Sequence, residues 1–311
     1  MKIAIVGFGY WGEIIFNSLN KLGDWVDKVY VVDINEGKKR KAKKYQLDFF
    51  RRLEGVLDKV EAVIVASDES SHFRLAKKCL LKKRHTLVTK PLATNFHQAQ
   101  ELVKIARRNN LVLMVDNTFI FDTSFLNLSQ KIKKGQIGNL LRIDSFRFSS
   151  NIFKPSTNVL VDLLPHDLSI FNFLFDIKNC KIININTQRL LNRYFDNAFI
   201  TLKFGGIITN SFLSWTAPSA RREMVFYGSK GVCLWQKRDK ETDEIKIFDY
   251  SQDKKINLKK ELVIGDKKET LKNVLGNFFE SIFKHKEPLT SGQRVLPEVK
   301  ILEKVLKSYP K

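Results

Sequence analysis

Asp162 and His166 are four positions apart in the sequence, and together their side chains could act as an acid–base pair. On a helix, that spacing brings two side chains onto one face, about 5–6 Å apart. Histidine is a natural base for the proton of an alcohol, because its unperturbed pKa is near neutrality. Asp162 would orient the imidazole or contact the substrate hydroxyl itself. The pair therefore predicts proton transfer at a hydroxyl or carbonyl group.

A second constellation, Gly7-Phe8-Gly9-Tyr10-Trp11-Gly12, has the spacing G-x-G-x-x-G. It follows an apolar run and opens a segment with helical periodicity. In that context the glycines provide a tight turn, a close approach to a pyrophosphate, and close packing of helix on strand. The free N–H groups at the helix start would hold the phosphates. All six residues are predicted to bind a dinucleotide.

Asp33 ends the next predicted strand, 21 residues after Gly12. A carboxylate there would accept hydrogen bonds from an adenosine ribose and repel a 2′-phosphate, so the expected cofactor is NAD. Residues 38–41 are Lys-Lys-Arg-Lys and leave NADP open, because they could bind a 2′-phosphate if the segment bends back. The other interpretation of these residues is a solvated helix face.

Strand and helix signals alternate through the first third of the chain and would position these residues. Apolar β-prone runs occur at residues 2–6, 29–33, 61–66, 85–89 and 111–115, with helical segments at 11–22, 36–45, 71–82 and 95–109. Strands alternating with helices predict a doubly wound parallel sheet, that is, an α/β Rossmann domain over residues 1–120.

The pattern changes after about residue 120. Predicted helices at residues 122–134, 269–285 and 297–308 flank long β-prone segments, and Gly205-Gly206 separates the strands of a predicted hairpin. A further helix is expected to begin at Pro165, because proline suits a first helical turn. Residues 121–311 are therefore predicted to form an α+β domain with a mostly antiparallel open sheet.

Two segments, residues 86–93 (TLVTKPLA) and 158–171 (NVLVDLLPHDLSIF), carry a family resemblance together with the glycine fingerprint. The chain resembles the Gfo/Idh/MocA oxidoreductases, which include glucose–fructose oxidoreductase and inositol dehydrogenase, over nearly its whole length. The resemblance implies that Lys90 touches the reacting hydroxyl and the nicotinamide, and that Asp162 and His166 form the catalytic pair. It also implies cofactor contacts for Ser67, His72 and Thr89.

Residues 153–165 and 214–231 look like the branch of this family that handles sugars and nucleotide-linked sugars. The implied reaction is hydride transfer between NAD(P) and a secondary alcohol or ketone of a sugar. Asn117 stands at a strand end that often carries histidine, and is expected to contact the substrate. An exposed sheet face commonly forms the subunit interface in the resembling family, so a homodimer or homotetramer is expected.

The chain departs from the family pattern at Thr89-Lys90-Pro91, where the family has Glu-Lys-Pro. Threonine cannot supply the missing charge. This departure motivates an alternative, a catalytically silent NAD(P)-binding regulator or sensor of the same fold. Whether the Lys90–Pro91 peptide bond is cis is not set by the sequence.

The 311 residues carry a formal net charge of +21, which raises the question of an anionic partner. Recognisable nucleic-acid-binding motifs are missing, and the basic residues are spread along the chain, so no nucleic acid is expected. An anionic sugar nucleotide fits the charge, with Arg147 as the first candidate for its phosphates and a surface charge as the other interpretation of that residue. Three widely spaced cysteines indicate neither disulfides nor a metal site. The sequence predicts a cytoplasmic enzyme without membrane contact.

Overall fold

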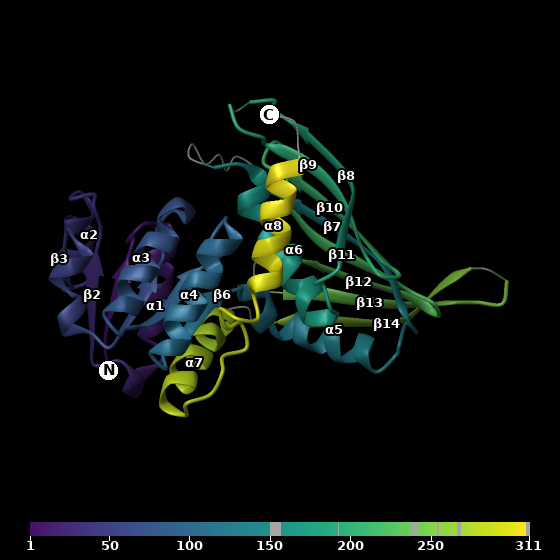
Figure 1. The fold of residues 1–311 in the computed structure, drawn as a ribbon. Coiled ribbons are helices and arrows are strands. Elements are labelled where there is room, and N and C mark those ends of the chain that lie inside the picture. The colour runs from purple at the N-terminus through teal and green to yellow at the C-terminus, as the bar shows by residue number, and fades with distance from the viewer. Residues whose placement is uncertain (150–156, 192, 238–241, 254, 266–268, 309–311) are drawn as a thin grey trace. The chain divides into compact units, whose positions relative to one another are not determined.

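The computed structural model describes the chain except for residues 150–156, 192, 238–241, 254, 266–268 and 309–311. The chain divides into two units (Figure 1). The first contains Met1–Thr118 and Leu271–Lys300, and the second contains Phe119–Thr270 and Ile301–Lys311. Of the stretch expected to mark a sugar-handling branch, residues 153–156 lie outside the described part.

The first unit is built on a parallel sheet with the strand order β3-β2-β1-β4-β5-β6. From β1 the chain first adds strands on one side, β2 and β3, and then on the other side, β4 to β6. Doubly wound sheets bind ligands at the carboxyl ends of the two strands where this direction changes, here β1 and β4. The edge strand β3 was not predicted, since it is only three residues long and its residues are not fully buried. The strands are β1 (Lys2–Val6), β2 (Lys28–Val32), β3 (Asp48–Phe50), β4 (Ala62–Val65), β5 (His85–Thr89) and β6 (Leu113–Asp116).

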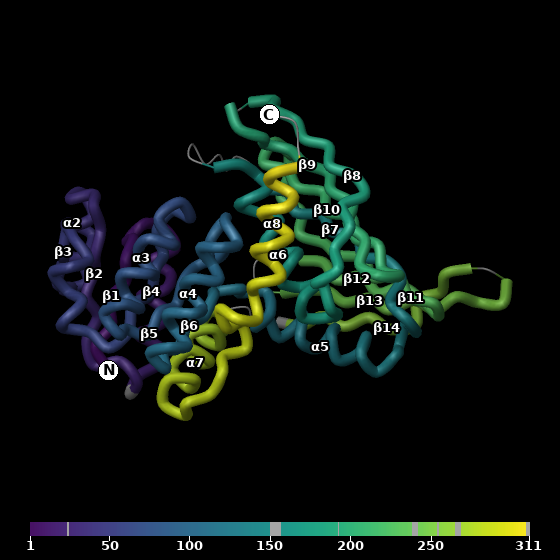
Figure 2. Tube along the Cα trace, viewed as in Figure 1, coloured from purple at the N-terminus to yellow at the C-terminus, as the bar shows by residue number. Residues whose placement is uncertain are grey.

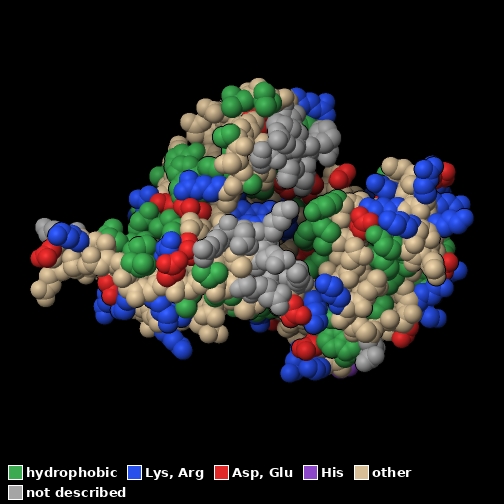
Figure 3. Space-filling model, turned by 180° about the vertical axis from the view of Figure 1, so that it is seen from behind, with side chains coloured by type: hydrophobic (Ala, Val, Ile, Leu, Met, Phe, Trp, Pro, Cys, Tyr) green, Lys and Arg blue, Asp and Glu red, His purple; other side chains and the backbone are tan. Residues whose placement is uncertain are grey.

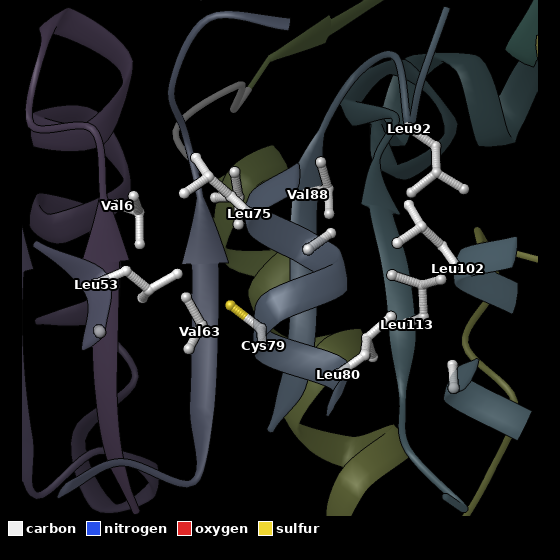
Figure 4. Packing of buried hydrophobic residues seen from close by; sticks show 14 of the residues in the cluster. Val6, Leu53, Val63, Leu75, Cys79, Leu80, Val88, Leu92, Leu102 and Leu113 are labelled. Carbon is white, nitrogen blue, oxygen red and sulfur yellow. The ribbon is translucent and has the colours of Figure 1, made fainter. Parts of the chain in front are cut away.

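Helices cover both faces of this sheet. Alternate strand residues such as Val63 and Val88 pack against Leu75 of α3 and Leu102 of α4 in one buried cluster (Figure 4). Ile5 points to the other face, where it approaches Gly12 of α1. The helices of the unit are α1 (Tyr10–Leu19), α2 (Lys38–Lys44), α3 (Glu69–Leu81), α4 (Phe96–Arg108) and α7 (Thr270–Phe283), with 3-10 turns at Gly23–Trp25, Leu53–Gly55 and Leu57–Lys59. A further 3-10 turn, Thr118–Phe121, begins at Thr118 and continues into residues of the second unit.

Residues 271–300 return to the first unit, although the sequence assigned everything after residue 120 to one second domain. The ring of Trp25 lies 5.9 Å from that of Phe279. The N–H of Val115 donates to the carbonyl of Thr290 at 2.9 Å, which extends the edge of the sheet beyond β6. Aromatic packing and main-chain pairing therefore hold this late segment to the early strands.

The second unit contains a sheet in the order β14-β13-β12-β11-β7-β10-β9-β8 among the described residues (Figure 2). Only β7 and β10 pair in parallel, so the predicted mostly antiparallel α+β domain is confirmed, as is the parallel Rossmann sheet. Gly205, at φ +58°, makes the predicted turn between β9 and β10. The strands are β7 (Leu140–Phe148), β8 (Cys180–Gln188), β9 (Asn197–Phe204), β10 (Ile207–Ser214), β11 (Arg221–Gly228), β12 (Gly231–Lys237), β13 (Thr242–Tyr250) and β14 (Ile256–Gly265).

The two faces of this sheet differ. One packs against α5 (Thr123–Lys133) and α6 (Val159–Leu174). The opposite face carries a row of three phenylalanines in cross-strand register, Phe199, Phe212 and Phe146, whose neighbouring rings stack at 4.6 and 4.8 Å. These rings are half-buried. The final helix, α8 (Leu296–Ser308), runs from residues of the first unit into residues of the second.

Basic side chains are distributed over the surface in several separate groups among acidic and apolar ones, as the face in Figure 3 shows. Many are neutralised locally, as in the pairs Lys78–Glu54 and Lys77–Glu101. In the described part of the chain, no helix combines the length and apolar character needed to cross a bilayer.

Candidate active site

The glycine loop has the geometry that the fingerprint predicts. Gly7 has φ +93°, and a Cβ there would lie 2.7 Å from the carbonyl oxygen of Ala66. A Cβ on Gly12 would lie 2.0 Å from the carbonyl oxygen of Gly7, so the helix can pack on the loop only without a side chain. A Cβ on Gly9 would meet no atom of the described residues within 4 Å. Gly9 therefore leaves an open cradle.

Helix α1 begins at this cradle. Gly9 is its N-cap residue, and no side chain within the described residues caps the helix there. The first N–H groups of a helix have no intrahelical partner and favour an anion such as a pyrophosphate. Tyr10 is largely exposed beside them, whereas Phe8 is fully buried and anchors the loop. The loop thus fits the diphosphate of a dinucleotide.

Asp33 follows β2 and is tied to the same loop. Its Oδ2 accepts the N–H of Phe8 at 2.8 Å, and its Oδ1 accepts the N–H of Asn35 at 2.8 Å. Each carboxylate oxygen can accept a further hydrogen bond. The two main-chain donors therefore orient Asp33, and its carboxylate oxygens keep acceptor capacity for a further donor.

The basic helix α2 lies next to this site. Lys41 pairs with Glu13 of α1 at 2.5 Å, whereas Lys39 and Arg40 are exposed. Hydrogen bonds from Lys41 and then Tyr45 hold the pKa of the Glu13 carboxyl below its usual value. Lys41 is therefore committed to the protein itself, and the exposed residues match the solvated helix face that the sequence left as one interpretation.

His72 joins the carboxyl ends of β4 and β5. Its Nδ1 lies 2.7 Å from the carbonyl of Pro91, and its Nε2 lies 2.9 Å from the carbonyl of Ser67 and 3.3 Å from the hydroxyl of Thr89. Burial lowers the pKa of the imidazole, with the two carbonyl contacts acting in the opposite direction. The Lys90–Pro91 bond is cis. Thr89, which stands where the family pattern has Glu, thus belongs with His72, Ser67 and Pro91 to one group of hydrogen-bonded residues around Lys90.

Two neighbouring residues at the end of β6 have contrasting surroundings. Asn117, expected to contact the substrate, is buried and donates from Nδ2 to Glu298 of α8 at 3.0 Å. Asp116, which was not singled out from the sequence, accepts the indole N–H of Trp11 at 3.0 Å. The signal available in the sequence was an acidic residue directly at a strand end, where ligands of parallel sheets gather.

In the second unit, Asp162 and His166 lie one turn apart on α6, as their spacing predicts. This helix begins earlier than expected: Asn158 is its N-cap, accepting the N–H of Val161, and Pro165 stands inside it rather than in its first turn. Asp162 is buried and accepts the indole N–H of Trp215 at 3.2 Å.

His166 is half-buried, and its ring meets the ring of Phe119 edge-on at 5.1 Å. Arg147 contacts the same ring, with its guanidinium carbon 4.4 Å from the ring centroid. Arg147 is buried and ion-paired with Asp167, which also accepts the hydroxyl of Ser145 at 2.8 Å. The surface charge considered as one interpretation of Arg147 is therefore wrong. Arg147 supports Phe119, which packs against His166.

A family model matches the first part of the chain. Residues 1–117 match the family model GFO_IDH_MocA, described as an oxidoreductase family with an NAD-binding Rossmann fold. The chain carries the NAD-binding domain of the Gfo/Idh/MocA oxidoreductases. This match confirms the family resemblance and the nicotinamide dinucleotide expected from the glycine loop.

The similarity to curated relatives extends beyond residues 1–117. Myo-inositol 2-dehydrogenase of Thermotoga maritima is 24% identical over 253 residues, which cover 74% of each protein. The scyllo-inositol 2-dehydrogenase (NADP⁺) IolW of Bacillus subtilis is 22% identical over 66% of this chain and 60% of its own length. Both relatives are dehydrogenases.

Solved structures share the fold of the whole chain. UDP-N-acetylglucosamine 3-dehydrogenase GnnA from Acidithiobacillus ferrooxidans superposes with a TM-score of 0.80 at 18% identity, covering 98% of this chain and 96% of GnnA. KijD10, a 3-ketoreductase from Actinomadura kijaniata in complex with NADP and TDP-benzene, has a TM-score of 0.85 at 15% identity, covering 100% of this chain and 99% of its own. At such identities the likeness establishes the two-unit fold alone.

Proposed function

We propose that this protein is an NAD(P)-dependent oxidoreductase that transfers a hydride between the nicotinamide and a secondary alcohol or ketone of a sugar, preferentially a nucleotide-linked sugar. The observation that carries the proposal is the glycine loop with its open cradle at Gly9 and uncapped helix start. The names of the relatives support the substrate class. They include two inositol dehydrogenases, a UDP-N-acetylglucosamine 3-dehydrogenase, and a 3-ketoreductase whose structure contains TDP-benzene.

Each predicted catalytic residue has a role in this proposal. The nicotinamide, when bound, supplies the acceptor or donor of the hydride. His166 takes the proton of the substrate hydroxyl in the oxidative direction and returns it in reduction. Asp162, on the same face of α6, contacts the substrate hydroxyl and orients the imidazole. Lys90 donates a hydrogen bond to the reacting oxygen, where negative charge develops.

The proposed cofactor preference is NAD over NADP. The carboxylate of Asp33 would repel a 2′-phosphate. Ile34, which follows it and is exposed, offers no hydrogen-bond donor to one. The side chain of Lys41 is engaged by Glu13. We therefore expect NADH to bind at least about tenfold more tightly than NADPH, a difference of about 1.4 kcal/mol.

We also propose that the protein works as a homodimer or homotetramer in the cytoplasm. The face of the second sheet opposite α6 carries the stacked row Phe199, Phe212 and Phe146, and the guanidinium of Arg221 lies 4.1 Å from the ring of Phe146. Half-buried aromatic and arginine side chains of this kind are typical of subunit interfaces. The three cysteines are free, which suits a reducing compartment.

A screen of the purified protein tests the proposed reaction. NAD and NADP are combined with free sugars, inositols and sugar nucleotides, while absorbance of the reduced nicotinamide and thermal stability are recorded. Turnover of a sugar or sugar nucleotide is the expected result. A ligand that binds the native state raises its melting temperature, so stabilisation by NAD without turnover of any substrate would instead support the silent regulator suggested by Thr89.

Variants then test the acid–base role. His166→Ala is expected to lower the rate of hydride transfer about 10²–10⁴-fold, the range typical of a lost general base. His97→Ala is the matched control, because His97 is exposed and has no proposed role. Equal rates for both variants and the wild type would exclude His166 as the base.

A further inference from the structure

Asp116 is a buried carboxylate to which the proposed function gives no role. It is 2% exposed at the carboxyl end of β6. Its Oδ2 accepts the indole N–H of Trp11 at 3.0 Å, and its Oδ1 accepts the hydroxyl of Thr118 at 2.8 Å. Both oxygens thus act as acceptors, which is the pattern of an ionised carboxylate. An ionised carboxylate in such a position needs a positive partner, because an uncompensated buried charge is costly.

The register of the sheet brings Lys90 to this carboxylate. Asp116 is the cross-strand partner of Thr89 in the parallel pair β5–β6, and Lys90 follows directly. Burial raises the pKa of Asp116. The hydrogen bonds from Thr118 and Trp11 oppose that rise most, and the positive charge of Lys90 opposes it further. Thr89 contributes no charge, and its hydroxyl faces Val65 and His72. Asp116 on the neighbouring strand thus carries a negative charge that interacts with Lys90.

We propose that Asp116 is a positioning residue that keeps the Lys90 side chain protonated and holds its ammonium group at the strand end. A protonated Lys90 can donate a hydrogen bond to the substrate oxygen but cannot act as a base, which leaves proton removal to His166. The partner role of Asp116 stands on the strand register and on the electrostatic effect between the two residues within the first unit. Its relevance to the substrate rests on the proposed function.

The same carboxylate also connects Lys90 to the cofactor loop. Trp11 belongs to the glycine fingerprint and opens the first turn of α1. Its indole N–H is directed to Asp116 rather than to solvent. In this proposal, Asp116 orients Trp11 of the phosphate-binding loop and also keeps Lys90 positively charged. An amide at residue 116 could still accept a hydrogen bond from Trp11, but it would carry no charge to hold the ammonium.

The test measures the titration of Lys90 itself. Purified protein is treated at a series of pH values with a trace of acetic anhydride, which acetylates only unprotonated amines, and acetylation at Lys90 is quantified by peptide mass spectrometry. Exposed Lys39 serves as the internal reference. The variants are Asp116→Asn, Asp116→Glu and, as a control of equal charge change in the same unit, Glu54→Gln, which removes the partner of Lys78.

The expected result in the wild type is a Lys90 pKa at or above that of Lys39, although Lys90 is half-buried. In Asp116→Asn the pKa of Lys90 should fall by about one unit or more, because an opposite charge nearby favours the protonated amine. Asp116→Glu should retain a Lys90 pKa close to that of the wild type, and Glu54→Gln should leave the Lys90 pKa unchanged. A purely structural role for Asp116 would lower the melting temperature without moving the pKa of Lys90.

Two results overturn the proposal: a Lys90 pKa in Asp116→Asn equal to that of the wild type, or a wild-type Lys90 pKa well below that of Lys39. The second result needs no variant, so the test stands even where Asp116→Asn does not fold. Acetylation requires neither substrate nor cofactor. A protein that turns over no sugar but shows the expected titration would therefore refute the proposed function and leave the Asp116–Lys90 pair intact.

Discussion

Two polar residues of the first unit, Asp33 and His72, are oriented differently from Asp162 and Asp167 of the second. Main-chain groups orient the first pair: Asp33 accepts the N–H groups of Phe8 and Asn35, and His72 contacts the carbonyls of Ser67 and Pro91. Other side chains orient the second pair. Asp162 is held by an indole, and Asp167 by a guanidinium and a hydroxyl.

This difference determines how the candidate residues of each unit respond to substitution. Main-chain partners depend on the path of the backbone, so only residues that set that path can remove them. Side-chain partners disappear with a single substitution and leave a buried polar group behind, which costs more than the hydrogen bond contributed. Removal of a side-chain partner should therefore destabilise the surroundings of Asp162 and Asp167, whereas the surroundings of Asp33 should respond chiefly to changes at the glycines of its loop.

Arg147→Met should have the largest effect on stability. It leaves the carboxylate of Asp167 buried without its cation, and breaking a buried pair in this way costs about 3–5 kcal/mol. Chemical denaturation measures the free energy of unfolding. The double variant Arg147→Met/Asp167→Leu should recover most of the loss, since replacing a buried pair with apolar residues is often neutral. If the single and double variants lost the same free energy of unfolding, the unpaired charge of Asp167 would not be the cause of the loss.

Gly12→Ala is the counterpart in the first unit. Its Cβ would lie 2.0 Å from the carbonyl oxygen of Gly7, so the helix must shift away from the loop. Overpacking of this kind lowers the free energy of unfolding by about 1–3 kcal/mol. We expect a value near the top of that range, because the added methyl group meets backbone atoms of Gly7, which cannot move as a side chain can. Thermal unfolding and NADH fluorescence are the measurements.

Gly9→Ala is the matched variant for this loop, because the open cradle has room for a methyl group. It should unfold like the wild type but bind NADH more weakly. A loss of stability equal to that of Gly12→Ala would show that the cradle is a structural turn and not a cofactor site.

Trp215→Phe should cost about 1–3 kcal/mol, because the carboxylate of Asp162 loses its buried donor. Trp25→Phe provides the comparison: the indole of Trp25 packs on Phe279 and Phe283, so its replacement mainly removes contact area. The pH profile of turnover separates the two, since only Trp215→Phe should alter it. Identical profiles would indicate that Asp162 is not part of the reacting pair.

Glu13→Gln should have the smallest effect, about 0.2–1 kcal/mol, because its partner Lys41 is partly exposed. The pKa of Glu13 is lowered in the folded protein. Its contribution to stability is therefore present above the unfolded-state pKa and is lost as the pH falls through the folded-state value. The difference between variant and wild type should vanish in acid. A difference that persists there would assign the effect to packing.

The first unit was largely predictable from local spacing. Gly7, Gly12 and Asp33 act through backbone geometry within a single βαβ repeat, and that geometry follows from a few positions close in sequence. The short edge strand β3 escaped prediction because three half-buried residues carry almost no periodic signal.

The site in the second unit was predictable only in part. The spacing of Asp162 and His166 gave their common helix face, but the partner of Asp162 is Trp215, 53 residues away. The burial of Arg147 likewise depends on Asp167 and Phe119, which different elements bring together. Pairings of this kind arise from tertiary packing, and no local pattern in one sequence encodes them. Asp116 was missed for the same reason, since its partner Trp11 comes from the other end of the first unit.

Residues 271–300 complete the first unit from a part of the chain more than 150 residues after its last strand. During synthesis the ribosome releases the six strands of the Rossmann sheet long before Phe279 can cover Trp25 and before Thr290 can pair with Val115. Until then the nascent chain exposes the apolar surface around Trp25 and an unpaired edge at β6, both of which invite aggregation. The strands of the first unit thus emerge long before the unit is finished, so the dinucleotide can stabilise it fully only after residues 271–300 have been made.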